Sequence, residues 1–251
     1  MEAATFAGVL GAIFGSFLNV VVYRLPRHES LVTPASHCPR CGTPVKPYDN
    51  IPVLSWLLLR GHCRSCGESI SVRYPLVELA TGLLCLGAVL AGETTTAVVL
   101  GIVLILLVVP IALIDLEHRI IPNRLTLLGA VLAIALGTAL DPSGEPARLI
   151  AGAAAGGFLL AAALAYPGGM GMGDVKLAGM MGLFLGSAVA PALMIALLTG
   201  TVVGVGIMTR KGAKAGRKTA VPFGPFLALG AVVAVFVGPQ LVDVYVNHFL
   251  H

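Results

Sequence analysis

Continuous apolar runs dominate this chain of 251 residues and restrict the folds open to it. Hydrophobic residues make up 57% of the sequence and charged residues only 11%, with a mean hydropathy of +0.94. A soluble domain of this size carries roughly 25% charged residues. The runs also lack the alternation of apolar and polar residues that barrel strands show. The sequence therefore predicts an all-α, polytopic membrane helix bundle.

The apolar runs predict about eight membrane spans, because a helix needs about 20 apolar residues to cross a bilayer. These spans lie near residues 5–23, 76–92, 97–114, 125–140, 148–166, 176–187, 190–208 and 224–246. The stretch from Leu177 to Met208 is too long for one straight span at about 1.5 Å per residue. Gly186, Ser187 and Pro191 offer a break within it. We expect two short spans there, or a partly re-entrant pair.

Basic residues gather in segments that these spans place on one side of the membrane. Of the 16 lysines and arginines, 15 fall in loops 24–74, 115–124 and 209–221 or at Lys176, and only Arg148 does not. Basic loops tend to stay in the cytoplasm. This side is therefore predicted to be cytoplasmic, with both termini outside.

Four cysteines form two CxxC pairs in the polar stretch that follows the first apolar run. They are Cys38, Cys41, Cys63 and Cys66, with 21 residues between the pairs. Four thiolates in two such turns fit a tetrahedral structural zinc site. A cytosolic loop keeps its thiols reduced, which disfavours disulfides. A redox dithiol and an iron–sulfur site stay open as alternatives.

These features predict three domains. They are a first transmembrane helix at 1–23, a cytosolic tetra-cysteine zinc domain at 24–75 and a membrane-embedded core at 76–251. Within the zinc domain, Trp56 and its neighbouring leucines favour a short helix. That helix would either lie in the membrane interface or be buried in the domain.

Two aspartates lie at the ends of apolar runs, Asp115 in IALIDLEHRIIPN and Asp174 in GMGDVK. A carboxylate at a membrane boundary is costly and usually functional, and the predicted spans place both at the cytoplasmic boundary. Two carboxylates about 3 Å apart cannot both ionise, so a pair supplies one base and one acid. The alternative is two unrelated carboxylates, with Asp115 paired to Arg119 and Asp174 to Lys176.

A run of glycines leads up to the second aspartate. Gly168, Gly169, Gly171 and Gly173 precede Asp174. Such a run lets another backbone approach closely, as an extended substrate strand would. The alternative is a flexible loop that only starts a helix.

Six ordered segments together resemble a known family. GMGDVK matches the GxGD pattern of membrane aspartyl proteases, and DLEHRIIPN at 115–123 is similar to a segment of type 4 prepilin leader peptidase / N-methyltransferases. The paired CxxC turns follow the same family. So do GSFLNVVVYRLP at 15–26, RYPLVELATG at 73–82 and VPFGPFLALG at 221–230.

The resemblance implies an aspartic endopeptidase in the bacterial inner (cytoplasmic) membrane, with its active site at the cytoplasmic face. It would cleave type 4 prepilins and pseudopilins, for pili or type II secretion, after the Gly that ends a basic leader. It would also N-methylate the new terminus with S-adenosylmethionine.

Carried over residue by residue, Asp115 and Asp174 would be catalytic, and Cys38, Cys41, Cys63 and Cys66 would bind zinc. Glu78 and Gly82 are the candidates for cofactor binding in methyl transfer. The expected partners are the prepilin substrates and the lipid bilayer, with no nucleic acid.

Three other functions remain open. One is a GxGD protease for another membrane substrate, such as a preflagellin. Another is a transporter that uses both aspartates as a relay, although transporters often have repeated halves and no repeat is evident. The third is a zinc-stabilised assembly factor that binds pilins without cutting them.

Overall fold

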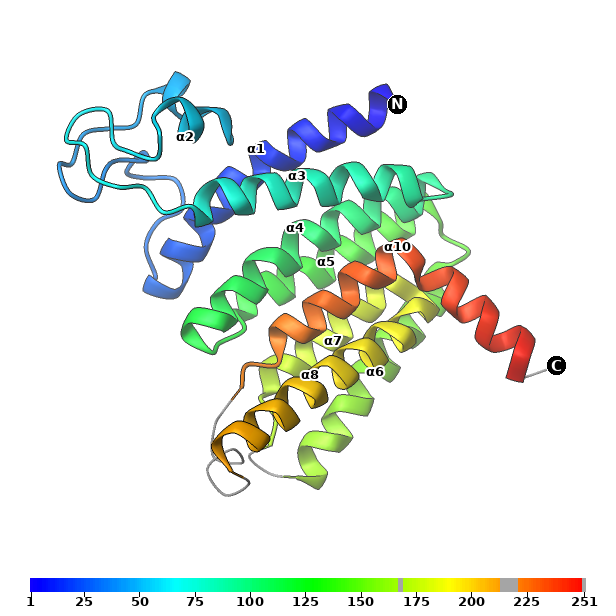
Figure 1. Ribbon diagram of the computed structural model, residues 1–251. Helices are drawn as coiled ribbons and strands as arrows, with labels where there is room; N and C mark the ends of the chain where they lie inside the picture. The colour runs from blue at the N-terminus through cyan, green and yellow to red at the C-terminus, as the bar shows by residue number, and fades with distance from the viewer. Residues whose placement is uncertain (167–168, 213–220, 250–251) are drawn as a thin grey trace. The chain divides into compact units, whose positions relative to one another are not determined.

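The structure is a computed structural model that describes residues 1–166, 169–212 and 221–249. Over these residues it is helical, with two isolated β-bridges and no β-strand, which confirms the all-α prediction (Figure 1). The long helices are α1 (Glu2–Arg24), α3 (Arg73–Ala91), α4 (Thr95–His118), α5 (Asn123–Leu140), α6 (Glu145–Ala165), α7 (Met172–Leu185), α8 (Val189–Lys211) and α10 (Gly224–Phe249). The short ones are η1 (Leu25–Arg27), η2 (Pro47–Asp49), α2 (Leu54–Leu58) and η3 (Gly186–Ala188).

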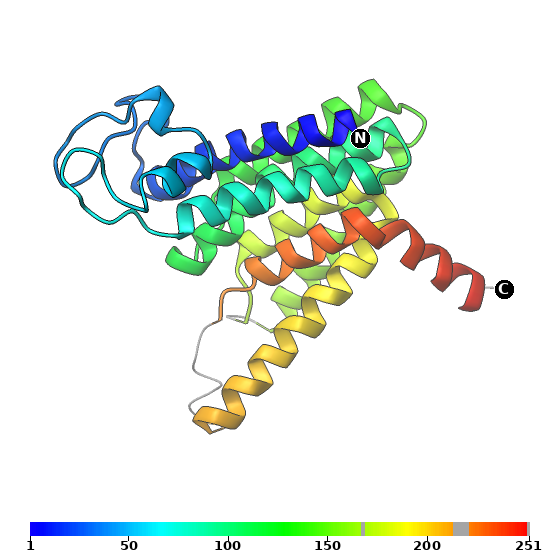
Figure 2. The same ribbon diagram turned by 45° about the horizontal axis from the view of Figure 1, so that its top comes forward.

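Seven segments among the described residues are long and apolar enough to cross a membrane, as in a multi-pass membrane protein. One of them, Met172–Arg210, has 39 residues and covers α7 and all of α8 except its last residue. The chain turns back between these helices at Gly186, whose φ is +56°, and α8 returns alongside α7 (Figure 2). The reversal agrees with the predicted break. At 14 residues, α7 is shorter than the roughly 20 that a full span needs.

The chain divides into two compact units, Met1–Leu90 and Ala91–His251. In the first unit, α1 and α3 approach closely through glycines. A Cβ added to Gly15 would lie 2.8 Å from the Cα of Glu78, and one added to Gly82 would lie 2.9 Å from the Gly8 carbonyl oxygen. Small residues permit this contact between membrane helices. The three domains predicted above stay a prediction.

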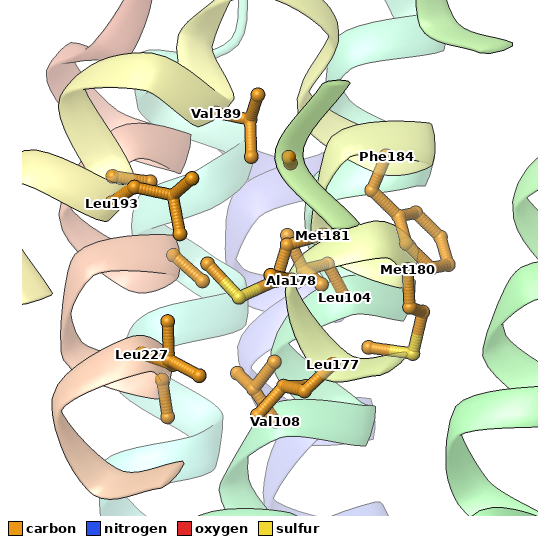
Figure 3. Packing of buried hydrophobic residues seen from close by; sticks show 14 of the residues in the cluster. Leu104, Val108, Leu177, Ala178, Met180, Met181, Phe184, Val189, Leu193 and Leu227 are labelled. Carbon is orange, nitrogen blue, oxygen red and sulfur yellow. The ribbon is translucent and has the colours of Figure 1, made fainter. Parts of the chain in front are cut away.

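In the second unit α7 lies at the centre of the bundle. It contacts α4, α5, α6, α8 and α10, and its Leu177, Ala178 and Met181 are fully buried. Figure 3 shows these side chains packed with Leu104 and Val108 of α4 and with Leu227 of α10. Because α7 is enclosed on so many sides, the residues at its first turn are held in place.

A buried arginine ties α5 to α6 at the end of the bundle where these helices connect. The Arg148 guanidinium donates to Asp141 Oδ2 at 2.8 Å, to Glu145 Oε2 at 3.1 Å and to the Gly137 carbonyl at 3.1 Å. Hydrogen bonds from Arg148, and then from Ser143 and the Gly144 N–H, hold the pKa of Asp141 below its usual range. This cluster satisfies the last carbonyls of α5.

Candidate functional site

Asp115 lies in the last turn of α4 and is 5% exposed. The helix ends three residues later, at His118, and Arg119 takes a left-handed conformation with φ 55°. The hydrogen-bond partner of the Asp115 side chain lies outside its own helix. Its Oδ2 accepts the backbone N–H of Gly224, at the start of α10, at 2.9 Å. The carboxylate is thus held by a segment 109 positions further along the chain.

Asp174 lies in the first turn of α7 and is 8% exposed. Its Oδ2 accepts the N–H of Gly171 at 3.1 Å, and its own N–H donates to the Gly171 carbonyl at 3.1 Å. This reciprocal pair closes the start of the helix, as in a capping box. One carboxylate oxygen of Asp174 therefore shapes its own helix.

The segments that carry the two aspartates are in direct contact. A Cβ added to Gly173 would lie 2.9 Å from the Cβ of Ile121, in the turn that follows Asp115. Helices α4 and α7 thus bring the two carboxylates to one end of the bundle, as a dyad needs.

Neither aspartate has a cationic partner among the described residues. Asp115 makes no salt bridge with Arg119, and Lys176 instead donates to Asn123 Oδ1 at 2.9 Å. The hydrogen bonds from Gly224 and Gly171 each reach the Oδ2 atom of the aspartate that they contact. Two buried carboxylates with free oxygens, and without a cation to neutralise them, are suited to acid–base chemistry.

The glycine run before Asp174 is described from Gly169 onward, and Gly168 lies outside the described residues. Two glycines of this run make structural contacts. Gly171 caps α7, and Gly173 has no side chain, which allows the backbone there to pack against Ile121. The part of the predicted basic loop at 213–220 also falls outside the described residues.

The four cysteines of the first unit meet in one cluster. The sulfur atoms of Cys38, Cys41, Cys63 and Cys66 all lie within 4.8 Å of one another. The Cys38 and Cys66 sulfurs are 3.8 Å apart. A zinc ion bound by four sulfurs at about 2.3 Å requires sulfur–sulfur separations of about 3.8 Å. The cluster could therefore hold a metal ion such as zinc.

The two CxxC turns are built alike. In each, the first cysteine N–H donates to the residue five positions on, to Thr43 at 3.0 Å and to Glu68 at 2.7 Å. Gly42 and Gly67 have φ near +70° and donate back to the first cysteine. Only glycine adopts this backbone freely, which is why one follows each pair.

The sulfurs affect one another's ionisation. The pKa of Cys41 is lowered to about 6, chiefly by its hydrogen bond with the Thr43 side chain. A backbone hydrogen bond at Glu68 lowers the pKa of Cys66, but partial desolvation and the other three sulfurs raise it to about 12. Four thiolates this close repel one another, and a bound cation removes that repulsion.

The short helix α2 presents both an inward and an outward face. The Trp56 ring packs on Gly61 and its indole N–H donates to the Ile70 carbonyl at 3.0 Å. Leu57 and Leu58 are exposed. Trp56 thus belongs to the cysteine-containing loop, while the leucines face outward from it.

Glu78 and Gly82, the candidates for methyl transfer, lie on the side of α3 that packs on α1. Glu78 is buried, and its Oε2 accepts the Val53 N–H at 2.7 Å. Val53 has φ +62°, an unusual conformation for a β-branched residue. Glu78 therefore holds a strained turn against α3. Gly82 is occupied by the contact with α1.

Two contacts of these sites were not predicted from the sequence. Gly224 was noted only as part of VPFGPF, although a glycine before a proline at a predicted helix start was a usable signal. The bond between Glu78 and Val53 joins residues 25 positions apart, and no local pattern indicates it.

The fold and the paired carboxylates define a class, the multi-pass membrane proteins with two aspartates at one end of a helix bundle. Comparison with known proteins is more specific. Residues 102–207 match the profile of the type IV leader peptidase family, and residues 9–91 match the bacterial peptidase A24 N-terminal domain. The chain belongs to the type IV leader peptidase family, and it is therefore an enzyme, a peptidase.

Several relatives share the name prepilin leader peptidase/N-methyltransferase. The one from Xanthomonas campestris is 35% identical over 96% of this chain and 93% of its own length, and that from Bacillus subtilis is 33% identical over 95% and 96%. The Myxococcus xanthus relative is 44% identical over 86% of this chain, which spans 66% of that protein. No solved structure matches the chain significantly.

Proposed function

We propose that this protein is an aspartyl endopeptidase that removes the basic leader of type 4 prepilins and pseudopilins, cutting after the Gly that ends the leader. The observation that carries this proposal is the pair Asp115 and Asp174. Both are buried, and α4 and α7 bring them to the same end of the bundle. Neither forms a salt bridge with a cation among the described residues. The names of the relatives supply the substrate class.

The two carboxylates supply the proton transfers of peptide hydrolysis. The ionised one takes a proton from water, whose oxygen attacks the scissile carbonyl carbon. The protonated one gives its proton to the carbonyl oxygen. As the tetrahedral intermediate collapses, the C–N bond breaks and the leaving amine takes a proton from the first carboxyl group. One hydroxyl of the intermediate returns its proton to the second carboxylate, which restores the starting state of the pair.

The cut is proposed to occur at the cytoplasmic face of the inner membrane. The spans predicted from the sequence put most of the basic residues on the same side of the membrane as both aspartates, and basic loops stay in the cytoplasm. A basic leader would stay on that side while the apolar segment behind it enters the bilayer. The scissile bond between them then falls at the level of the two aspartates.

We further propose that the protein N-methylates the new terminus, with S-adenosylmethionine as the methyl donor. The relatives' names pair the two activities. The 24–75 loop and the start of α3 are the proposed region. Glu78 and Gly82 are its proposed residues, because a buried carboxylate can bind an α-ammonium group and Gly82 sets the distance between α1 and α3.

Cys38, Cys41, Cys63 and Cys66 are proposed to bind one structural zinc ion, which would hold together a loop too small for a core of its own. Metal analysis of purified protein should give about one zinc per chain. The double substitution Cys38→Ser and Cys63→Ser should remove it, while Cys85→Ser, outside the cluster, should keep it. A folded wild-type protein without metal would contradict this assignment.

The intact mass of a purified model prepilin, after incubation with this protein and S-adenosylmethionine, tests the proposal. Loss of the leader after Gly together with the gain of one methyl group would support both activities. Loss of the leader alone would support the peptidase and contradict the methyl transfer. An unchanged mass, with an inserted enzyme, would contradict the prepilin substrate and favour the non-enzymatic alternatives.

A further inference from the structure

The first turn of α10 directs one backbone donor at Asp115. The first N–H groups of a helix have no partner within the helix. In α10, Pro225 has no N–H, and Phe226 and Leu227 both donate to the Phe223 carbonyl, at 3.0 and 3.1 Å. The Gly224 N–H is the one that remains, and it donates to the buried Asp115 Oδ2 at 2.9 Å.

The position of Gly224 has no room for a side chain. A Cβ there would lie 2.7 Å from Asp115 Oδ2 and 3.2 Å from Asp115 Cβ. Carbon atoms do not approach a carboxylate oxygen this closely, so any other residue would push the carboxylate or the start of α10 away. The contact is therefore specific to glycine because of space, and not because of backbone conformation.

Two phenylalanines hold this turn against α8. The Phe223 and Phe226 rings lie 6.3 Å apart and flank Gly224 in the sequence. Both lie over Gly200 of α8, where an added Cβ would be 3.3 Å from the Phe223 ring and 3.6 Å from the Phe226 ring. The position of the Gly224 N–H is thus set by ring packing on a neighbouring helix.

We infer that the start of α10 is a third part of the peptidase site and that Gly224 is a positioning residue for Asp115. Its N–H occupies Oδ2 and fixes the carboxylate plane, which leaves Oδ1 for water or substrate. The positive end of the α10 dipole also faces the carboxylate. This inference rests on the proposed function, because it assumes that Asp115 acts in peptide cleavage.

The variant Gly224→Ala tests it, with Gly204→Ala as the matched control because a Cβ at Gly204 meets nothing within 4 Å. A displacement of about 1 Å in a catalytic group can lower a rate by about 100-fold. We expect the kcat for leader cleavage to fall by about that factor in Gly224→Ala, with KM changed less than twofold. Gly204→Ala should keep both constants.

A second, milder variant provides the test if Gly224→Ala does not fold. Gly200→Ala crowds the Phe223 ring at 3.3 Å without touching Asp115. We expect a smaller fall in kcat, again with constant KM and an unchanged unfolding temperature. A wild-type kcat in folded Gly224→Ala, or in folded Gly200→Ala if the first variant does not fold, would overturn the inference. A rise in KM alone would do the same.

The proposed function is checked separately in the same assay. Wild-type protein must cleave the prepilin and Asp115→Asn must not. If wild-type protein leaves the prepilin intact, the proposed function fails. If cleavage depends on Asp115 but is unaffected by Gly224→Ala, only the role of Gly224 fails.

Discussion

The bundle of the second unit has a pair of carboxylates at each end, and the two pairs differ in their hydrogen-bond partners. At one end, Asp141 and Glu145 share the guanidinium of Arg148, which also binds backbone carbonyls. At the other end, Asp115 accepts the backbone N–H of Gly224 and Asp174 accepts that of Gly171. No salt bridge joins either of them to a cation among the described residues.

We propose that this difference separates a structural cluster from a catalytic one. A carboxylate bound by arginine has its charge neutralised and its oxygens occupied, so it stabilises the fold and is a poor base. A pair without a cation keeps free oxygens and can share a proton. The same residue type therefore serves packing at one end of the bundle and, as we propose, chemistry at the other.

The largest expected effect is on the rate of prepilin cleavage, which should depend on the carboxylates at only one end of the bundle. Asp115→Asn and Asp174→Asn should each lower prepilin cleavage by more than about 1,000-fold, because each removes one member of a unit. Glu145→Gln, at the other end, should keep cleavage within about threefold. Initial rates measured by mass spectrometry check both. An inactive but well-folded Glu145→Gln protein would contradict the division.

The second effect is on stability. Arg148→Met leaves the buried Glu145 carboxylate without its partner, and such a change costs about 3–5 kcal/mol. Thermal unfolding in detergent should show a large fall in the unfolding temperature. Adding Glu145→Gln and Asp141→Asn to the same chain should restore part of it. An Arg148→Met protein that unfolds like wild type would show that the cluster is not structural.

A smaller effect depends on pH. The pKa of Asp141 is lowered in the folded protein by its hydrogen bonds with Arg148, so it stabilises the fold above its unfolded value of about 3.9. That contribution is lost as the pH falls through the lowered folded pKa. Asp141→Asn should therefore lower the unfolding temperature slightly at pH 7. The difference in unfolding temperature from wild type should vanish in strong acid; a constant difference would contradict the ion pair.

The smallest expected effect concerns the cation nearest in sequence to Asp174. Lys176 is exposed and donates to Asn123, and an exposed interaction of this kind is worth about 1 kcal/mol or less. Lys176→Met should therefore change the cleavage rate by less than about fivefold. Complete loss of cleavage, with unchanged folding, would show that the aspartates do depend on a cation.

Sequence reasoning reached the features that rest on local patterns. The apolar runs predicted the helices, the length of the 177–208 stretch predicted the reversal at Gly186, and the spacing of the cysteines predicted their cluster. It also placed Asp115 and Asp174 at one boundary, because the number of spans between them and the positions of the basic loops fix their side.

The remaining features depend on contacts between distant segments. The partner of Asp115 is Gly224, and the free energy of that contact comes from how α8 and α10 pack, which no local pattern contains. From the sequence, Arg148 stands out only as the one basic residue outside the segments that are predicted to be cytoplasmic. Its acidic partners lie three and seven positions before it in the chain, a spacing that could have indicated the cluster.

The most direct test of the aspartate pair is the cleavage rate of Asp115→Asn, Asp174→Asn and the double variant, measured side by side on one model prepilin. Groups that act as a unit are not additive, so the second substitution has little left to remove. We expect all three proteins to cleave at the same residual rate and to unfold at the wild-type temperature. Substantial cleavage by either single variant would contradict the shared role of the two carboxylates.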